Sequence, residues 1–320
     1  MFSGITIFGG LFLAWSIGAN NSANLFGTAV GTRSIRFRTA VLLVAIFAVL
    51  GSMTEGPALY EAYSFSVTIT LPLAFAATCA AAVTMFALTY FSLPASASQA
   101  AVGGMMGIAI WSSGAAEAGW AKLGGWVFCW AITPLSAAVI AFAFIRGLSP
   151  LLRRVTDMGL LNRIYKIGFV VTGCYGAYTL GANNVVVTTG PFFKAGLFGD
   201  PSASMSAFTA ALIGGVSIAL GALTYSRKVM RTIGEKITAL DPFSALVAVF
   251  AHSIVMHIFT QVHVPVSSSQ AIVGAVAGVG FSRGSRALNS RLLLVVLSGW
   301  VLVTLVSGLL AFLLAWLIGC

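Results

Sequence analysis

The chain has 320 residues, a mean hydropathy of +1.00 and a formal net charge of +10, with 17 basic and only 7 acidic side chains. This composition excludes a soluble globular domain and is typical of a polytopic helical membrane protein. The positive charge does not indicate nucleic-acid binding, because the basic residues cluster between apolar segments, where they mark loops. We expect an all-α protein in the cell inner (plasma) membrane.

The apolar segments predict ten membrane crossings, at roughly 2–31, 39–56, 64–91, 95–112, 123–146, 164–193, 205–224, 243–260, 265–282 and 292–318. The first segment has no basic n-region and no cleavage site, which predicts a permanent helix instead of a removable signal peptide. With ten crossings, every basic residue except Lys122 and Lys194 lies on one side. The positive-inside rule makes that side cytoplasmic, so both termini are expected outside.

The motif Gly18-Ala19-Asn20-Asn21 interrupts the first apolar segment and returns unchanged at Gly181-Ala182-Asn183-Asn184. Glycine and asparagine are poor residues for a helix interior, because glycine loses more entropy and asparagine competes for backbone hydrogen bonds. The motifs therefore predict two helices that are broken at membrane mid-depth, near residues 18–24 and 181–187.

A second motif is also repeated, since Leu93–Gly103 and Val264–Gly274 share a proline followed by serines and Gln-Ala, 171 positions apart. These repeats predict two halves, residues 1–150 and 164–320, joined by a cytoplasmic loop at 151–163. Five crossings per half is an odd number, so the second half begins from the opposite face of the membrane. We therefore expect two inverted repeats of five transmembrane helices each.

Repeated motifs at broken helices predict a substrate site, because half-helix N-termini at the midplane present free N–H groups and positive dipole ends. The side chains near these ends can all donate hydrogen bonds and carry no charge, which suits a compact oxyanion. For single serines, helix packing through small-x-x-x-small patterns remains an equal alternative. The predicted substrate-binding residues are Asn20, Asn21, Ser22, Asn24, Ser96, Ser98, Gln99, Asn183, Asn184, Ser267, Ser269 and Gln270.

The sequence contains few candidates for metal binding, proton transfer or catalysis. The four cysteines lack CxxC spacing, which indicates neither a metal cluster nor a disulfide framework. His252 and His257 lie about 140° apart around a helix, so they do not share a metal-binding face. One of the histidines is a candidate proton carrier, although a packed histidine is the more frequent case, and Glu55 is the acid nearest to a predicted core. No catalytic motif is present, so we expect neither an enzyme nor a cofactor.

The duplicated motifs resemble the inorganic phosphate transporter (PiT) family, which carries GAND-x-x-N-x-x-G and P-V-S-T-T-H signatures in inverted repeats. The stretch Thr232–Thr238 also resembles a segment of that family. The resemblance implies a secondary carrier for a tetrahedral oxyanion and is compatible with a homodimer. This sequence departs from the signatures at two places in each half: Asn21 and Asn184 replace the aspartates, and Gln99 and Gln270 replace the histidines.

The loss of both aspartates removes anionic ligands for sodium, which favours protons as the coupling ion and leaves sodium as the alternative. Amides at these positions supply N–H donors, and sulfate, unlike phosphate, has no proton to offer a carboxylate. The sequence therefore predicts proton-coupled sulfate uptake, with a resemblance to a sulfate-permease branch of the family. A sodium- or proton-coupled phosphate symporter is the second hypothesis, and an anion channel is the third.

Overall fold

The computed structural model describes residues 3–63, 68–91, 95–232, 240–282, 284 and 290–319, with backbone only for Ser3, Ala62, Thr232 and 290–297. Pro94, most of the 232–238 stretch and Cys320 lie outside the described residues. The fold is helical: α1 (Ser3–Thr6), α2 (Phe8–Gly31), α3 (Phe37–Thr54), α4 (Gly56–Ala62), α5 (Leu71–Tyr90), α6 (Ala97–Ser113), a 3-10 turn (Ala115–Glu117), α7 (Trp120–Leu152), α8 (Met158–Lys194), α9 (Ser204–Thr232), α10 (Pro242–Gln261), α11 (Ser268–Ser282) and α12 (Ser290–Ile318).

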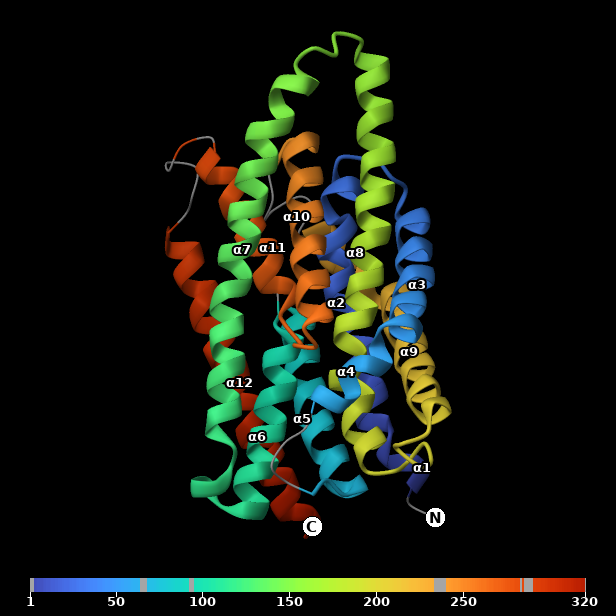
Figure 1. Ribbon diagram of the computed structural model, residues 1–320, viewed down its shortest axis with the longest axis vertical. Helices are drawn as coiled ribbons and strands as arrows, with labels where there is room; N and C mark the ends of the chain where they lie inside the picture. Colours follow the sequence, from blue (N-terminus) through green and yellow to red (C-terminus); the bar gives the residue numbers. More distant parts are fainter. Residues whose placement is uncertain are drawn as a thin grey trace.

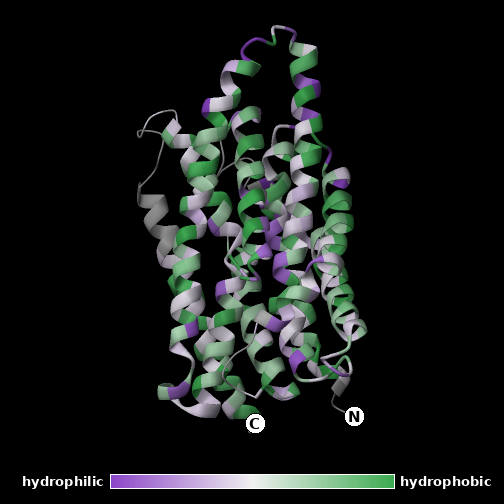
Figure 2. Ribbon diagram, viewed as in Figure 1, coloured by the Kyte–Doolittle hydropathy of each residue, from purple (hydrophilic) through white to green (hydrophobic). Residues whose placement is uncertain are grey.

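Each of the ten predicted apolar segments contains one long helix. Six of the described helices are long and apolar enough to cross a membrane: α3, α5, α7, α9, α10 and α12. Large apolar side chains are exposed along the outer helices, for example Phe128 and Leu135 on α7 and Leu302 and Leu305 on α12. Hydrophilic residues gather instead in the middle of the bundle and at its upper end (Figure 2). This distribution, apolar outside and polar inside, defines a multi-pass membrane protein.

The prediction that α2 and α8 are broken is wrong, because both helices run without interruption through their Gly-Ala-Asn-Asn motifs. Two polar side chains at the motifs bond back to their own helix: Ser22 Oγ donates to the Gly18 carbonyl, and Asn184 Nδ2 donates to the Leu180 carbonyl at 3.0 Å. The motif glycines allow neighbouring helices to approach closely. A Cβ on Gly18 would overlap the backbone of α9, and one on Gly181 would overlap the backbone of α3.

The prediction of ten separate crossings also needs correction. Helices α5 and α6 lie together in the lower half of the molecule, while α10 and α11 lie in the upper half, and each pair turns back near the middle (Figure 1). The two hairpins meet tip to tip, since Ser98 Oγ donates to the Val266 carbonyl oxygen at 2.7 Å and Ser269 Oγ donates to the Ala95 carbonyl oxygen. The sequence could not show this, because α5 and α10 each have the length and hydropathy of a full span.

The described chain begins at α1 and ends at α12 at the same end of the bundle, opposite the α7–α8 turn (Figure 1). A hairpin that returns to its own side replaces two crossings with none, so it leaves the sides of all other loops unchanged. The predicted separation of basic residues therefore does not depend on how the hairpins are counted. Which end faces the cytoplasm stays a prediction.

Candidate functional site

The junction between the two hairpin tips brings two helix N-termini together at the centre of the protein. Ser96 caps α6, with its Oγ accepting from the backbone N–H of Gln99 at 3.4 Å, and Ser267 Oγ accepts from Gln270 N–H at 3.2 Å at the start of α11. Both serines are fully buried. Because α6 and α11 run away from this junction in opposite directions (Figure 1), both positive dipole ends point into it. The junction is therefore favourable for an anion.

The first asparagine of each motif holds a hairpin tip. Asn183 donates to Thr260 Oγ1 at 3.1 Å and to the Val264 carbonyl at 3.0 Å, and its Oδ1 accepts from Val266 N–H at 3.0 Å. Asn20 makes the matching contacts in the other half, donating to Thr89 Oγ1 at 3.0 Å and accepting from Ala95 N–H at 3.4 Å. The hydrogen bonds of these amides position the backbone that surrounds the junction, and their predicted contact with substrate stays a prediction.

The second asparagine of each motif is different. Asn21 and Asn184 are each 1% exposed, and the Oδ1 of both lacks a hydrogen-bond partner among the described residues. For Asn184 the orientation of the amide follows from one of its two N–H groups, which donates to the Leu180 carbonyl and leaves Oδ1 on the other side of the amide. Buried polar atoms without partners cost about 1–3 kcal/mol each, so these two oxygens are candidates for contact with a ligand.

A cavity of about 570 Å³ lies beside the junction, between α7 and α12. Gln99 and Gln270 line it from the hairpin tips, and Trp130 and Trp300 line it from the flanking helices. All four are at least 94% buried. In the described part of the chain, the Oε1 of both glutamines and the Nε1 of both tryptophans lack partners. The cavity thus offers unsatisfied donors and acceptors at motif-equivalent positions of the two halves.

The remaining predicted residue, Asn24, joins a chain of bonds with two residues that were not predicted, and this chain has no counterpart at the positions related by motif spacing. Asn24 Nδ2 donates to Ser268 Oγ at 3.2 Å, and the same oxygen lies 2.9 Å from His252 Nε2. His252 is fully buried, and its Nδ1 finds no partner among the residues described. The equivalent positions by motif spacing are Val187, Ala97 and Ala81, all without a polar side chain.

Sequence reasoning missed several of these residues. Thr89 and Thr260 anchor the first asparagines, and their separation of 171 positions was a signal that could have revealed them. Trp130 and Trp300 recur at similar spacing, but nothing in the sequence shows that their indole N–H groups are unpaired. Ser268 and His252 had no signal, because their contact depends on how α10 and α11 fold together.

Comparison with known proteins agrees with this architecture. The sequence pattern of the phosphate transporter family matches residues 17–160 and 153–311. Relatives named "Putative phosphate permease" occur in Pyrococcus furiosus, 27% identical over 96% of this chain and 94% of the relative, and in Haemophilus influenzae, 24% identical over 95% and 93%. The solved structure of a sodium-dependent phosphate transporter has the same fold, with a TM-score of 0.89, 23% identity and coverage of 99% of both chains.

A membrane bundle with an uncharged polar centre, built around two opposed hairpins, defines the class of the protein as a transporter and not an enzyme. The chain belongs to the phosphate transporter family. The expected resemblance to that family is confirmed, whereas the relatives found give no support to a sulfate-permease branch.

Proposed function

We propose that the protein is a secondary carrier that moves inorganic phosphate across the membrane and binds it at the hairpin junction. The observation that carries the proposal is the pair of buried carbonyl oxygens of Asn21 and Asn184, which have no partner in the described part of the chain. They belong to the two motifs whose first asparagines hold the converging N-termini of α6 and α11. The N-termini suit the negative oxygens of an anion. The carbonyl oxygens require a hydrogen-bond donor or a cation.

These oxygens accept hydrogen bonds, and this reverses the argument that favoured sulfate, which assumed that the asparagines donate them. We expected the asparagines to supply N–H donors, but one N–H of Asn184 already donates to the Leu180 carbonyl. Its Oδ1 is an acceptor that has no partner among the described residues, and phosphate near neutral pH keeps at least one P–O–H group that can donate to it. Sulfate has no such group and would leave both oxygens unpaired. The names of the relatives point in the same direction.

We also propose that the two halves are inverted repeats that exchange access to the junction between the two sides of the membrane. Matched packing supports this. Gly51 lies against the Tyr178 backbone as Gly221 lies against the Trp15 backbone, and Gly103 and Gly274 contact α12 and α7 in the same way. Carriers with such repeats bind substrate near the midplane, where the hairpin tips meet.

Substrate choice can be tested by uptake of radiolabelled phosphate into proteoliposomes that contain the purified protein. We expect saturable phosphate uptake that unlabelled phosphate abolishes and an equal concentration of sulfate leaves nearly unchanged. Labelled sulfate uptake that phosphate fails to inhibit would establish the sulfate hypothesis instead. Currents far above the turnover of a carrier would indicate an anion channel.

A second test addresses the unpaired oxygens. Replacing Asn184 by aspartate keeps the side-chain size and restores the family's carboxylate, so we expect phosphate affinity to be kept or improved and a sodium requirement to appear. The matched control is Asn162→Asp, at an exposed position on the same helix. Initial rates at varied phosphate and sodium concentrations measure the effect. Unchanged kinetics in both Asn184→Asp and Asn21→Asp would remove these residues from the site.

A further inference from the structure

A second polar cluster lies away from the hairpin junction, where α3, α8 and α10 meet. His257 Nε2 on α10 is 3.3 Å from Glu55 Oε1 at the end of α3, and the two side chains are 30% and 23% exposed. Tyr178 OH donates to the same Glu55 oxygen at 2.7 Å, and Gln261 Nε2 donates to the other at 3.1 Å. Tyr175 OH lies 2.7 Å from His257 Nδ1. The carboxylate and imidazole are thus fully engaged with each other and with neutral partners.

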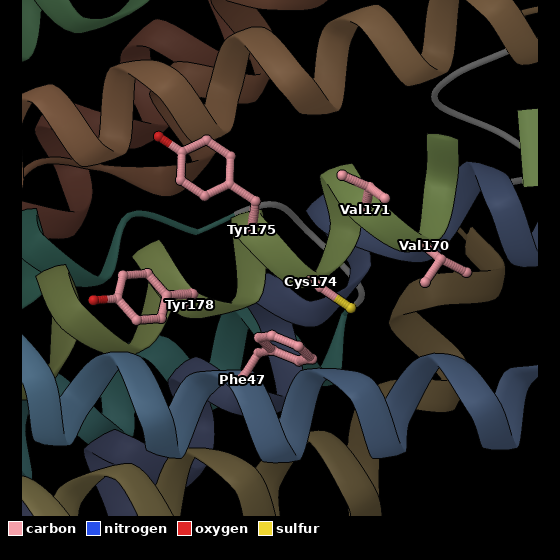
Figure 3. A pocket seen from close by; sticks show the side chains of 6 residues that line it. All are labelled: Phe47, Val170, Val171, Cys174, Tyr175 and Tyr178. Carbon is pink, nitrogen blue, oxygen red and sulfur yellow. The ribbon is translucent and has the colours of Figure 1, made fainter. Parts of the chain in front are cut away.

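This cluster lies about halfway along the bundle. Tyr175 and Tyr178 occupy the middle of α8, and their hydroxyls extend past a 450 Å³ groove that is lined by Phe47, Val170, Val171 and Cys174 (Figure 3). Ionisable groups at such depth are costly, and they are retained in transporters where they carry ions or protons. A glutamate oxygen beside a histidine nitrogen is an arrangement that can hold a proton between two side chains.

In the first half of the chain, aromatic rings occupy the positions that correspond to Tyr175, Tyr178 and His257 and contact one another in the same way. Motif spacing pairs Tyr175 with Phe12, Tyr178 with Trp15, and His257 with Phe86. The ring centroids of Phe12 and Phe86 lie 5.6 Å apart, and those of Tyr175 and His257 lie 5.5 Å apart.

The match extends to the end of α3 and to the C-terminal part of α9. Trp15 Nε1 donates to Thr224 Oγ1 at 2.8 Å, and Thr54 Oγ1 donates to Tyr178 OH at 2.8 Å. Tyr225 follows Thr224 in the sequence, and Glu55 follows Thr54. The Tyr225 ring contacts the rings of both Trp15 and Phe86. One architectural position is therefore filled by aromatic rings beside the α5–α6 hairpin and by an acid and a histidine beside the α10–α11 hairpin.

We propose that Glu55 and His257 form the binding site of the coupling proton, and that this site controls only the α10–α11 hairpin. The inference rests on the proposed transport of phosphate through the junction. His257 lies on the hairpin and Glu55 lies outside it, so gain or loss of a proton changes the attraction between the hairpin and α3. The aromatic counterpart holds the α5–α6 hairpin at every pH.

The other ionisable groups that bond to the pair are two tyrosines. Among the described residues, the titratable side chains facing it are Tyr175 and Tyr178 on α8. The helices α2, α7 and α11, which also pack on α10, place none beside it in that part of the chain, nor do α4 and α9, which pack on α3. His252 lies on the same helix but bonds to Ser268 inside the protein.

The test uses full-length protein in proteoliposomes, with two variants that keep the packing. Glu55→Gln keeps the size of the side chain and one acceptor oxygen, and His257→Phe copies the residue that occupies the equivalent position in the first half. Two activities are measured: phosphate exchange at equal pH on both sides, and phosphate accumulation driven by a pH gradient. Glu61→Gln, at an exposed acid on α4, is the matched control.

We expect both variants to retain exchange while gradient-driven accumulation falls by about tenfold or more, a usual size for coupling between sites. The control is expected to behave as the wild type. Retained accumulation in both variants, accumulation by wild type that needs a sodium gradient instead, or loss of exchange in the variants would each overturn the proposal. Absence of phosphate exchange in the wild type would instead contradict the proposed function, so the two failures are distinguishable.

Discussion

Replacing Asn183 by leucine is expected to abolish phosphate transport and to lower thermal stability. The change removes three hydrogen bonds at the tip of the α10–α11 hairpin and leaves the Val266 N–H and the Val264 carbonyl without their partner in the protein interior. Each buried group left unpaired costs about 1–3 kcal/mol. Because the released backbone forms one wall of the junction, the site loses its geometry together with its support.

The measurement combines proteoliposome uptake with thermal unfolding in detergent. Asn162→Leu changes an exposed asparagine on the same helix and serves as the control, with little expected effect on either quantity. Asn20→Leu should follow Asn183→Leu with a smaller loss, since its contact to Ala95 N–H is longer. Normal uptake by Asn183→Leu would show that the asparagine does not position the tip.

Replacing Gly181 by alanine is expected to prevent stable folding, although the change adds a single methyl group. The new carbon would overlap the carbonyl of Ala48, and backbone atoms cannot move aside as a flexible side chain can. Overpacking of this kind costs about 1–3 kcal/mol, and more where the backbone is the obstacle. Gly18→Ala should fail in the same way against the Ile218 carbonyl.

The control for this prediction is Gly125→Ala on α7, where nothing lies within 4 Å of the added atom. That variant gains up to about 1 kcal/mol of helix propensity. Size-exclusion profiles and melting temperatures in detergent separate the outcomes. A monodisperse Gly181→Ala protein with the wild-type melting temperature would mean that α3 and α8 do not pack as closely as the structure shows.

Part of the candidate site could be predicted from the sequence. The repetition of Asn20-Asn21 at Asn183-Asn184 identified the centre of the protein, because a polar pair in an apolar segment has few other uses. The sequence did not show that the two asparagines of each pair have different roles. The first asparagine supports a hairpin and the second has an unpaired oxygen, and this difference depends on where the tips of α6 and α11 lie.

The sequence by itself determined the class, since hydropathy, charge placement and repeated motifs require a helical membrane protein with two related halves. It also located the ten helices of 15 residues or more in the described part of the chain, because apolar length is a local property. Tertiary structure decided which helices turn back, that the motif glycines permit close packing and do not break helices, and which amide atoms remain free. The pairing of Glu55 with His257 belongs to the same category, because residues 202 positions apart meet only when three helices pack together.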